Sequence, residues 1–206
     1  MSIFYLIRHG STDAAGHILT GRTAGVHLNE QGRKQIRELP ERFKNVPLKA
    51  IFATPLERTQ ETAEPLALAF GLTVQIAREM TEVDYGEWTG RRTDELRDDP
   101  LWRRYLSFRS SVTIPGGESM LQIQERVVGF MGALHRAQPE AHIALVSHGD
   151  PIKTAVCYYM GVPLDLFFRF VITPSSVTVV RVADDEACVV TLNNRHDRLD
   201  EHIGAL

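Results

Sequence analysis

Short apolar runs alternate with longer amphipathic segments along this chain. Runs of about four to eight residues rich in Val, Ile, Leu, Phe and Ala are typical of strands. Strands are therefore predicted at 3–7, 50–53, 73–76, 143–146, 176–182 and 187–192. The last two runs flank the acidic segment Asp184-Asp185-Glu186, and this arrangement predicts a hairpin.

Helical segments fall between these strands. Their periodicity predicts helices at about 29–45, 54–71, 118–137 and 150–160. Asn29 and Asp150 are the predicted N-caps of the first and last of these helices, and Pro40 is expected to kink or divide the first one. The sequence Thr54-Pro55-Leu56-Glu57 has the pattern of a capping box with proline at the first helical position. Alternating strands and helices indicate an α/β fold with a mostly parallel sheet and helices on its faces.

One stretch departs from this alternation. Residues 79–117 mix Asp, Glu, Arg, Trp and Pro with short helical pieces at 93–97 and 101–108. We interpret the stretch as an insertion that covers one end of the sheet, and Trp88 either packs beneath it or lines a pocket. A chain of 206 residues can bury one substantial core, so we assign residues 1–206 to a single domain.

Composition and charge narrow the class of protein. A hydrophobic content of 43% and a charged content of 24% are ordinary for a soluble globular chain. A net charge of -3 argues against a nucleic-acid partner, and two cysteines are too few for a disulfide framework or a metal cluster. The N-terminus lacks a basic region with a long apolar core, and no apolar run approaches the roughly 20 residues of a membrane span. These features predict a cytoplasmic protein without a membrane partner.

The reactive side chains gather where predicted strands end. His9 and His148 each follow a strand and precede a glycine, Arg8 adjoins His9, and Arg58 lies in the first turn of the helix after the second strand. Because the carboxyl ends of parallel strands meet at one edge of a sheet, we expect these four residues at one crevice. Two guanidinium groups and two imidazoles can bind a phosphate group and attack it. The alternative for Arg8 and His9 alone is a solvated turn.

Five motifs occur in one order along the chain. They are Arg8-His9-Gly10, the segments 56–63 (LERTQETA), 82–90 (EVDYGEWTG) and 115–119 (PGGES), and Val146-Ser147-His148-Gly149. Together they resemble the histidine phosphatase superfamily, and more narrowly its phosphoglycerate-mutase-like branch. No single motif is decisive, but five in register are highly specific. The resemblance implies a three-layer α/β/α sandwich with a mostly parallel central sheet, in agreement with the hydrophobic pattern.

The resemblance also implies a catalytic role for each matched residue. His9 corresponds to the nucleophile that becomes phosphohistidine, Glu82 corresponds to the proton donor, and the phosphoryl group is held by Arg8, Arg58 and His148. Phosphate monoesters hydrolyse extremely slowly without a catalyst, so a covalent intermediate and electrostatic stabilisation are both needed. The histidine must be neutral to attack, and the carboxyl group must be protonated to donate, so we expect a raised pKa for Glu82.

Further substrate contacts follow from the same resemblance. The turn Thr20-Gly21-Arg22 matches a substrate-loop pattern of the family. The residues expected to contact substrate, besides Arg8 and Arg58, are Ser11, Thr20, Gly21, Arg22 and Gly149. The family often has Glu or Gln in place of Ser11 and a phosphate-binding Asn in place of Ala15, and its mutases often have Asn in place of Asp150.

The predicted function is a phosphatase that needs no metal or other cofactor and acts on a small phosphorylated metabolite. The nearest alternative is a phosphoglycerate mutase, an isomerase in which a substrate hydroxyl, not water, accepts the phosphoryl group. The chain is shorter than true mutases of the family, although the pairs Arg91-Arg92 and Arg103-Arg104 keep this alternative open.

Two other classes fit the sequence less well. An inactive binding or regulatory module is disfavoured because all five residues with a predicted catalytic role are present. A binuclear metallohydrolase using His9, His148 and Asp150 would need further Asp and His ligands. The oligomeric state is left open, with a homodimer as one option.

Overall fold

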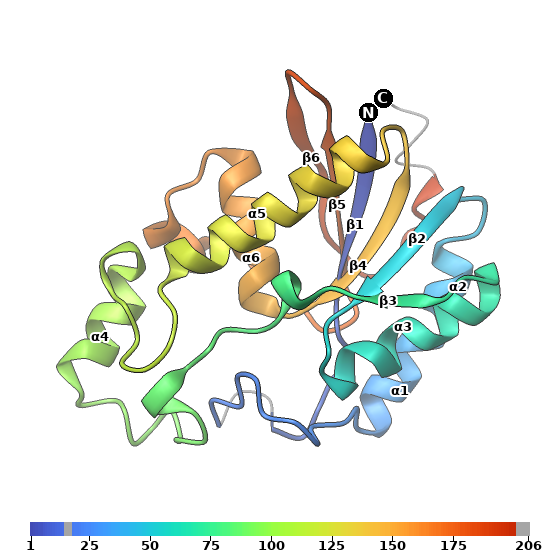
Figure 1. Cartoon of the computed structure of the whole chain (residues 1–206). Helices are drawn as coiled ribbons and strands as arrows, with labels where there is room; N and C mark the ends of the chain where they lie inside the picture. The colour runs from blue at the N-terminus through green and yellow to red at the C-terminus, as the bar shows by residue number, and fades with distance from the viewer. Residues whose placement is uncertain (15–17, 201–206) are drawn as a thin grey trace.

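A six-stranded sheet in the order β3-β2-β4-β1-β5-β6 forms the middle layer of the protein (Figure 1). The structure is a computed structural model, and it describes residues 1–14 and 18–200. The strands that run parallel are β1 (Ser2–Arg8), β2 (Leu48–Ala53), β3 (Val74–Ile76) and β4 (His142–Ser147). On the other side of β1, β5 (Val177–Val182) and β6 (Ala187–Asn194) form the predicted antiparallel hairpin and complete the sheet. The predicted strands and the mostly parallel sheet are confirmed.

Helices cover both faces of this sheet and make the three-layer sandwich that was predicted. One face packs against α1 (Glu30–Ile36), α2 (Leu39–Arg42) and α3 (Glu57–Phe70). The other face packs against α5 (Met120–Ala137) and α6 (Gly149–Met160). Alternate residues of a strand point to opposite faces, so β1 sends Tyr5 and Ile7 to the first core and Phe4 and Leu6 to the second. This two-sided burial explains why β1 is apolar almost throughout.

The first predicted helix is divided, as Pro40 suggested. Helix α1 ends at Ile36, and Pro40 lies in the first turn of α2, where a proline costs the helix no hydrogen bond. The predicted N-cap is confirmed, because Asn29 Oδ1 accepts a hydrogen bond of 2.9 Å from the Gly32 N–H. On the opposite face of the sheet, α5 begins after Ser119, which forms a capping box with Gln122.

Two predicted helix starts were wrong. Helix α3 begins at Glu57 with Leu56 as its N-cap, because the Thr54 hydroxyl is bonded to His148 and Thr59. Helix α6 begins at Gly149 with His148 as its N-cap, so Asp150 lies inside the first turn. In both places a short polar side chain that matched a capping pattern forms a tertiary contact instead.

The insertion joins the core of the α5–α6 face. It contains η1 (Arg78–Met80), η2 (Gly86–Trp88), α4 (Pro100–Ser107) and η3 (Arg109–Ser111), and η4 (Leu164–Arg169) packs against η3. The predicted helix at 101–108 is confirmed, whereas 93–97 forms turns. Trp88 is 3% exposed and packs edge-on against Trp102, with ring centroids 5.2 Å apart. Trp88 is therefore a packing residue of the insertion.

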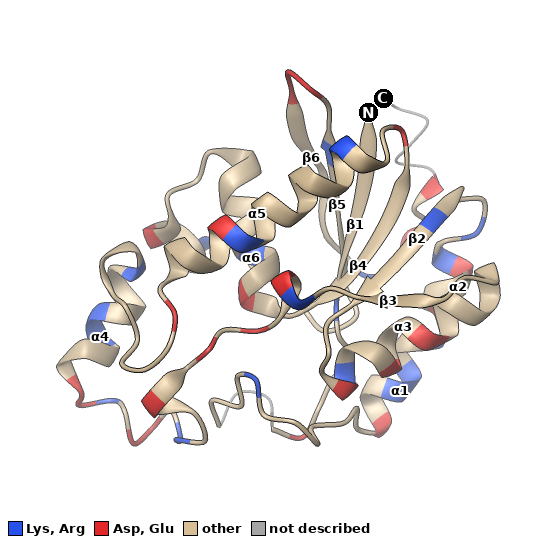
Figure 2. Ribbon diagram, viewed as in Figure 1, with Lys and Arg blue, Asp and Glu red and all other residues tan. Residues whose placement is uncertain are grey.

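Opposite charges are interspersed over the surface. Figure 2 shows blue and red segments side by side on α1 and α5. The arginine pairs of the insertion follow the same pattern: Arg92 pairs with Asp94 at 2.8 Å, and Arg103 with Asp98 at 3.0 Å. Exposed pairs of this kind contribute little to stability. No helix within 1–14 and 18–200 has the length and apolarity needed to cross a membrane.

Candidate active site

The register of β1 and β4 brings the two candidate histidines together. Arg8 pairs with Ser147 at the ends of these parallel strands, so His9 and His148 follow at neighbouring positions. The His9 N–H donates a 3.0 Å hydrogen bond to the Ser147 carbonyl. The two imidazole rings have centroids 5.2 Å apart. The strand ends therefore form one reactive edge, as the pattern predicted.

A cavity of about 270 Å³ opens at this edge of the sheet. Arg8, His9, Arg58 and Glu82 all line it, and His148 lies behind His9 without any exposed surface. Four separate elements supply these side chains: the end of β1, the start of α3, the loop before η2 and the N-terminus of α6. The tertiary structure thus gathers all five predicted core residues at one cavity.

His9 is held in the tautomer that a nucleophile requires. Its Nδ1 lies 2.7 Å from the Gly10 carbonyl oxygen, which can only accept, so Nδ1 carries the proton. The lone pair of the neutral ring then lies on Nε2. Burial, followed by the charges of Arg58 and Arg8, lowers the pKa of His9 to about 3. The imidazole is therefore neutral at pH 7 and able to attack an electrophile.

The three residues predicted to hold the phosphoryl group, Arg8, Arg58 and His148, each have a polar atom without a hydrogen-bond partner among the described residues. Arg58 is 2% exposed, and its Nη2 donates to the Gly21 carbonyl at 2.8 Å. Arg8 Nη1 donates to the Ile172 carbonyl at 2.5 Å. Within the described part of the chain, Arg8 Nε, Arg58 Nη1 and His148 Nδ1 are buried and lack a hydrogen-bond partner. Buried polar groups normally have hydrogen-bond partners, so these three unpaired atoms indicate a binding site for an anion with several oxygens.

Glu82 has the acidity of a group that can both donate and accept a proton near pH 7. Its side chain is 16% exposed, and its Oε2 lies 3.9 Å from His148 Nδ1. Burial, followed by the charge of Asp150, raises the pKa of Glu82 to about 7. A carboxyl group with this pKa is partly protonated in neutral solution. The raised value agrees with the proton-donor role predicted for Glu82.

Comparison with known proteins assigns the chain to a family. The model of the histidine phosphatase superfamily (branch 1) matches residues 4–195 of the chain. The chain belongs to this superfamily. The match covers β1, with the nucleophile candidate at its end, and all other elements that line the cavity. Membership supports a phosphatase enzyme, as the motifs predicted.

Similar proteins include both phosphatases and mutase-like members of the superfamily. The chain is 28% identical over 193 residues to phosphoserine phosphatase 1 of Hydrogenobacter thermophilus, covering 91% of this chain and 90% of that one. It is 32% identical over 161 residues to a protein of Cronobacter sakazakii named "Probable phosphoglycerate mutase GpmB", covering 77% and 75%. Among solved structures, YhfR of Bacillus stearothermophilus superposes with a TM-score of 0.88 at 24% identity, covering 94% and 98%. The superposition shows that the fold is shared.

Threonines form a second layer behind the two histidines of this histidine phosphatase. The Thr54 hydroxyl lies 3.1 Å from His148 Nε2 and 2.8 Å from the Thr59 hydroxyl. Thr62 accepts a 3.1 Å hydrogen bond from the Gly10 N–H. Thr59 and Thr62 belong to the 56–63 motif, and Thr54 was assigned to a capping box. The spacing of these threonines in the sequence does not show that they bond to the loops holding His9 and His148.

Asp150 and Arg109 form a partly buried ion pair that the sequence analysis did not identify. Arg109 is 5% exposed, and its Nη1 donates to Asp150 Oδ2 at 3.1 Å. The rings of Tyr105, Phe167 and Phe168 surround the guanidinium, with centroids 4.2 to 4.6 Å from its Cζ. Asp150 lines the cavity, and its charge contributes to the raised pKa of Glu82. This pair therefore connects the insertion to the acidity of the candidate proton donor.

Replacing Asp150 by asparagine is expected to make Glu82 more acidic. The substitution removes a negative charge that raises the pKa of Glu82, while burial keeps that pKa above its ordinary value. The proton-donor role predicted for Glu82 requires its protonated form, so phosphoenzyme formation from an alkyl phosphate should fall as pH rises through that pKa. In Asp150→Asn the fall should move to lower pH by about 0.5 to 1, measured in single turnovers.

The control is the exposed Asp94, because Asp94→Asn should leave the pH profile in place. Asparagine at 150 keeps an acceptor for Arg109, and circular dichroism verifies that the variant is folded. An unchanged profile, or one displaced to higher pH, would contradict the influence of Asp150 on Glu82.

The predicted substrate contacts divide into two groups. Thr20, Gly21 and Gly149 line the cavity. Gly21 has φ of +46°, and a Cβ there would lie 2.9 Å from the Val83 carbonyl oxygen, so only glycine suits the position. Ser11 lies away from the cavity lining, because its N–H and hydroxyl both donate to Gln35 Oε1. Ala15, which stands where the family often has a phosphate-binding Asn, falls outside the described residues.

Arg22 is engaged elsewhere than at the cavity. Its guanidinium pairs with Glu118 at 2.7 Å and with Asp84 at 3.5 Å, and its Nε donates to the Glu82 carbonyl at 3.0 Å. Two carboxylates thus neutralise the charge that was predicted to bind substrate. In this structure Arg22 stabilises the backbone that presents Glu82.

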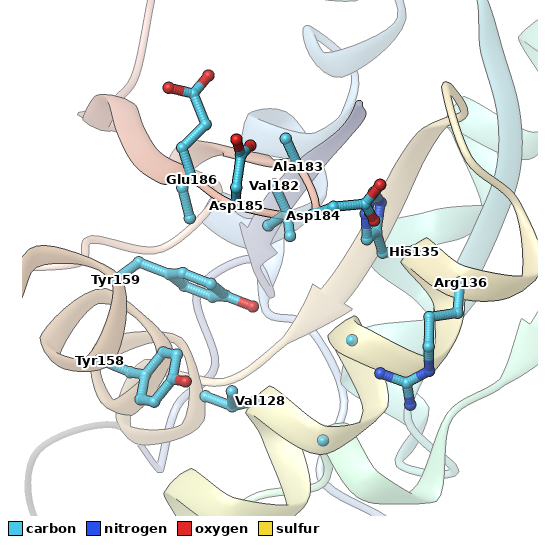
Figure 3. A pocket seen from close by; sticks show the side chains of 13 residues that line it. Val128, His135, Arg136, Tyr158, Tyr159, Val182, Ala183, Asp184, Asp185 and Glu186 are labelled. Atoms are coloured by element: carbon cyan, nitrogen blue, oxygen red, sulfur yellow. The ribbon is translucent and has the colours of Figure 1, made fainter.

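A wider groove lies away from the reactive edge. It has a volume of about 750 Å³ and runs between α5, the end of α6 and the β5–β6 hairpin. Figure 3 shows Tyr158 and Tyr159 on one side of it and Asp184, Asp185 and Glu186 on the other. None of the predicted site residues lines this groove. Size therefore does not identify the reactive cavity, whereas unpaired donors and perturbed pKa values do.

Within residues 1–14 and 18–200, no cluster of three His, Cys, Asp or Glu side chains is arranged to hold a metal ion. Cys157 and Cys188 are both free thiols.

Proposed function

We propose that this protein is a metal-independent phosphatase that hydrolyses a small phosphorylated metabolite through a phosphohistidine intermediate on His9. One observation carries the proposal: a neutral imidazole with Nε2 free lies at a cavity lined by arginines that have unpaired buried donors. The arginines match phosphate oxygens, and the imidazole can attack phosphorus.

The first chemical step forms the phosphoenzyme. His9 Nε2 attacks phosphorus and forms a P–N bond as the P–O bond to the leaving group breaks. Protonated Glu82 transfers its proton to the departing oxygen. Arg8 and Arg58 stabilise the charge on the phosphoryl oxygens during transfer. A neutral alcohol leaves, and Glu82 becomes a carboxylate.

The second step returns the enzyme to its starting state. The Glu82 carboxylate takes a proton from water as the water oxygen attacks phosphorus. The P–N bond breaks, its electron pair returns to His9 Nε2, and inorganic phosphate leaves. The pKa of about 7 for Glu82 suits both steps, since neither protonation state dominates in neutral solution.

Phosphoglycerate mutase activity is the second candidate, and the 32% identical mutase-like relative favours it. In a mutase the phosphoryl group on His9 would pass to a hydroxyl of the bound organic product. Against this, the charges of Arg92 and Arg103 are paired with neighbouring aspartates on the surface. We therefore favour water as the acceptor.

The test is phosphate release measured on a panel of phosphorylated sugars, sugar acids, amino acids and nucleotides. Exhaustive dialysis against a chelator is expected to leave the rate unchanged, because arginines supply the positive charge at this site. A coupled assay on phosphoglycerates measures mutase activity in parallel. A strict Mg²⁺ or Zn²⁺ requirement would refute the proposed mechanism. Faster transfer to a phosphoglycerate hydroxyl than to water would support an isomerase.

The cellular setting is part of the same proposal. A small phosphorylated metabolite as substrate, the ordinary composition and the net charge of -3 support a cytoplasmic enzyme without nucleic-acid or membrane partners. A homodimer stays a prediction that analytical ultracentrifugation can test.

A further inference from the structure

Lys153 lines the catalytic cavity and is not used by the proposed chemistry. It lies on α6 one helical turn after Gly149, where the helix direction carries its side chain back toward the N-terminus of the helix and the cavity. The residue is half-buried. Among the residues with described positions, Lys153 has no hydrogen bond or ion pair. A half-buried ammonium without a direct ion pair is unusual, and the charge of Asp150 acts on this one only at longer range.

Aromatic rings hold this ammonium in place. Lys153 Nζ lies 4.7 Å from the ring centroid of Phe167, 5.4 Å from that of Phe168 and 5.8 Å from that of Phe170. Cation–π contacts orient the side chain but do not neutralise it. The acid on the preceding turn, Asp150, is already paired with Arg109 at 3.1 Å. Burial lowers the pKa of Lys153, so an anion at the cavity would stabilise its charged form.

When a phosphate monoester binds, the positive charges that line the cavity exceed the negative ones by one. The phosphate dianion faces the two guanidinium groups of Arg8 and Arg58. Glu82 is protonated for the first step, and the charge of Asp150 is offset by Arg109. Lys153 is the cation that remains.

We infer that Lys153 binds a carboxylate on the leaving group, so that the enzyme prefers phosphomonoesters of small carboxylic acids. This inference rests on the proposed function. A single ammonium is a point charge that matches one negative charge, whereas phosphate is better matched by arginine forks such as those of Arg8 and Arg58. The cavity of about 270 Å³ has room for a small organic leaving group beside the phosphate.

The test uses two substrates that differ in one group. 3-Phosphoglycerate and glycerol 3-phosphate have the same carbon skeleton, with a carboxylate in the first and a hydroxymethyl group in the second. The wild-type enzyme should favour 3-phosphoglycerate in kcat/KM. Lys153→Met should lower kcat/KM for 3-phosphoglycerate about 10- to 100-fold, the expected loss of one hydrogen bond to a charged group. It should change glycerol 3-phosphate and an aryl phosphate less than about threefold.

Two further variants control for charge and for folding. Lys153→Arg should retain most of the preference, because it keeps the charge. Lys34→Met removes an exposed lysine of α1 and should change nothing. Competitive inhibition of aryl phosphate hydrolysis by each three-carbon compound gives the same comparison independently of its turnover. Absence of aryl phosphate turnover in the wild-type enzyme would refute the proposed phosphatase function itself.

Three outcomes would overturn the assignment of Lys153 while leaving the phosphatase intact. Equal losses on all three substrates in Lys153→Met would show that Lys153 acts on the phosphoryl group. No loss on any substrate would show that it binds nothing in the cavity. A stronger preference for glycerol 1,3-bisphosphate than for 3-phosphoglycerate, lost in Lys153→Met, would assign the lysine to a second phosphate.

Discussion

Replacing His9 by alanine is expected to abolish phosphoenzyme formation and to lower turnover by at least ~10⁴-fold. The imidazole of His9 is the group whose Nε2 lone pair is free at the cavity, and methyl cannot replace it as a nucleophile. Labelling with a phosphorylated substrate, rapid quenching with alkali and mass spectrometry of peptides kept at alkaline pH locate the phosphoryl group. The wild-type protein should carry an acid-labile group on His9 only.

The exposed His196 provides a matched control for this variant. His196→Ala should retain full activity and the phosphorylated His9, because its side chain lies on the surface away from the cavity. Circular dichroism should show that His9→Ala is folded, since the change removes a buried polar ring and adds no volume. Label on a Ser, Asp or Cys side chain would refute the phosphohistidine mechanism.

Replacing Glu82 by glutamine is expected to slow substrates with poor leaving groups far more than substrates with good ones. An alkoxide leaving group needs a proton, whereas an activated aryl oxide departs without one. The loss should be ~10²- to 10⁴-fold for a sugar phosphate, the scale of general acid catalysis, and small for an aryl phosphate. Single-turnover phosphoenzyme formation measures this step separately from the later hydrolysis.

Arg58→Ala is the comparison that separates the roles. In the proposed mechanism Arg58 stabilises the phosphoryl group, which both substrates share, so its loss should slow both to a similar extent. The wild-type rate for the alkyl substrate should fall as pH rises through about 7, because Glu82 then loses the proton it must donate. Equal losses for both leaving groups in Glu82→Gln would remove Glu82 as the acid. Asp150, the other carboxylate at the cavity, would then be the next candidate.

The active site is built at a cost to local hydrogen bonding. Arg58 is almost fully buried with one terminal nitrogen unpaired, and His148 has an unpaired ring nitrogen. An unsatisfied buried donor costs about 1 to 3 kcal/mol. The arginine is held by the Gly21 carbonyl, and His148 by the Thr54 hydroxyl. These fixed partners keep the donors in place before a phosphate arrives, which is the preorganisation that catalysis needs.

Local pattern was sufficient for most of the secondary structure but failed where side chains had tertiary partners. The strands were found because apolar runs bounded by turn residues are local signals. The starts of α3 and α6 were misassigned because Thr54 and Asp150 match capping patterns while bonding to His148 and Arg109. A capping pattern states what a side chain can do within one turn, and it holds no information about a residue 41 or 94 positions away.

The amino-acid sequence by itself determined the sheet, its covering helices and the edge at which His9, His148, Arg8 and Arg58 meet. It could do so because buried strands must be apolar and parallel strands must end at the same edge. A raised pKa for Glu82 was expected from its role, but only the tertiary structure shows what raises it, namely burial and the charge of Asp150. The tertiary structure also shows that Arg22, a predicted substrate contact, is paired with Glu118 and Asp84. Charge and pKa are set by what packs around a group, and residues far apart in sequence supply that packing.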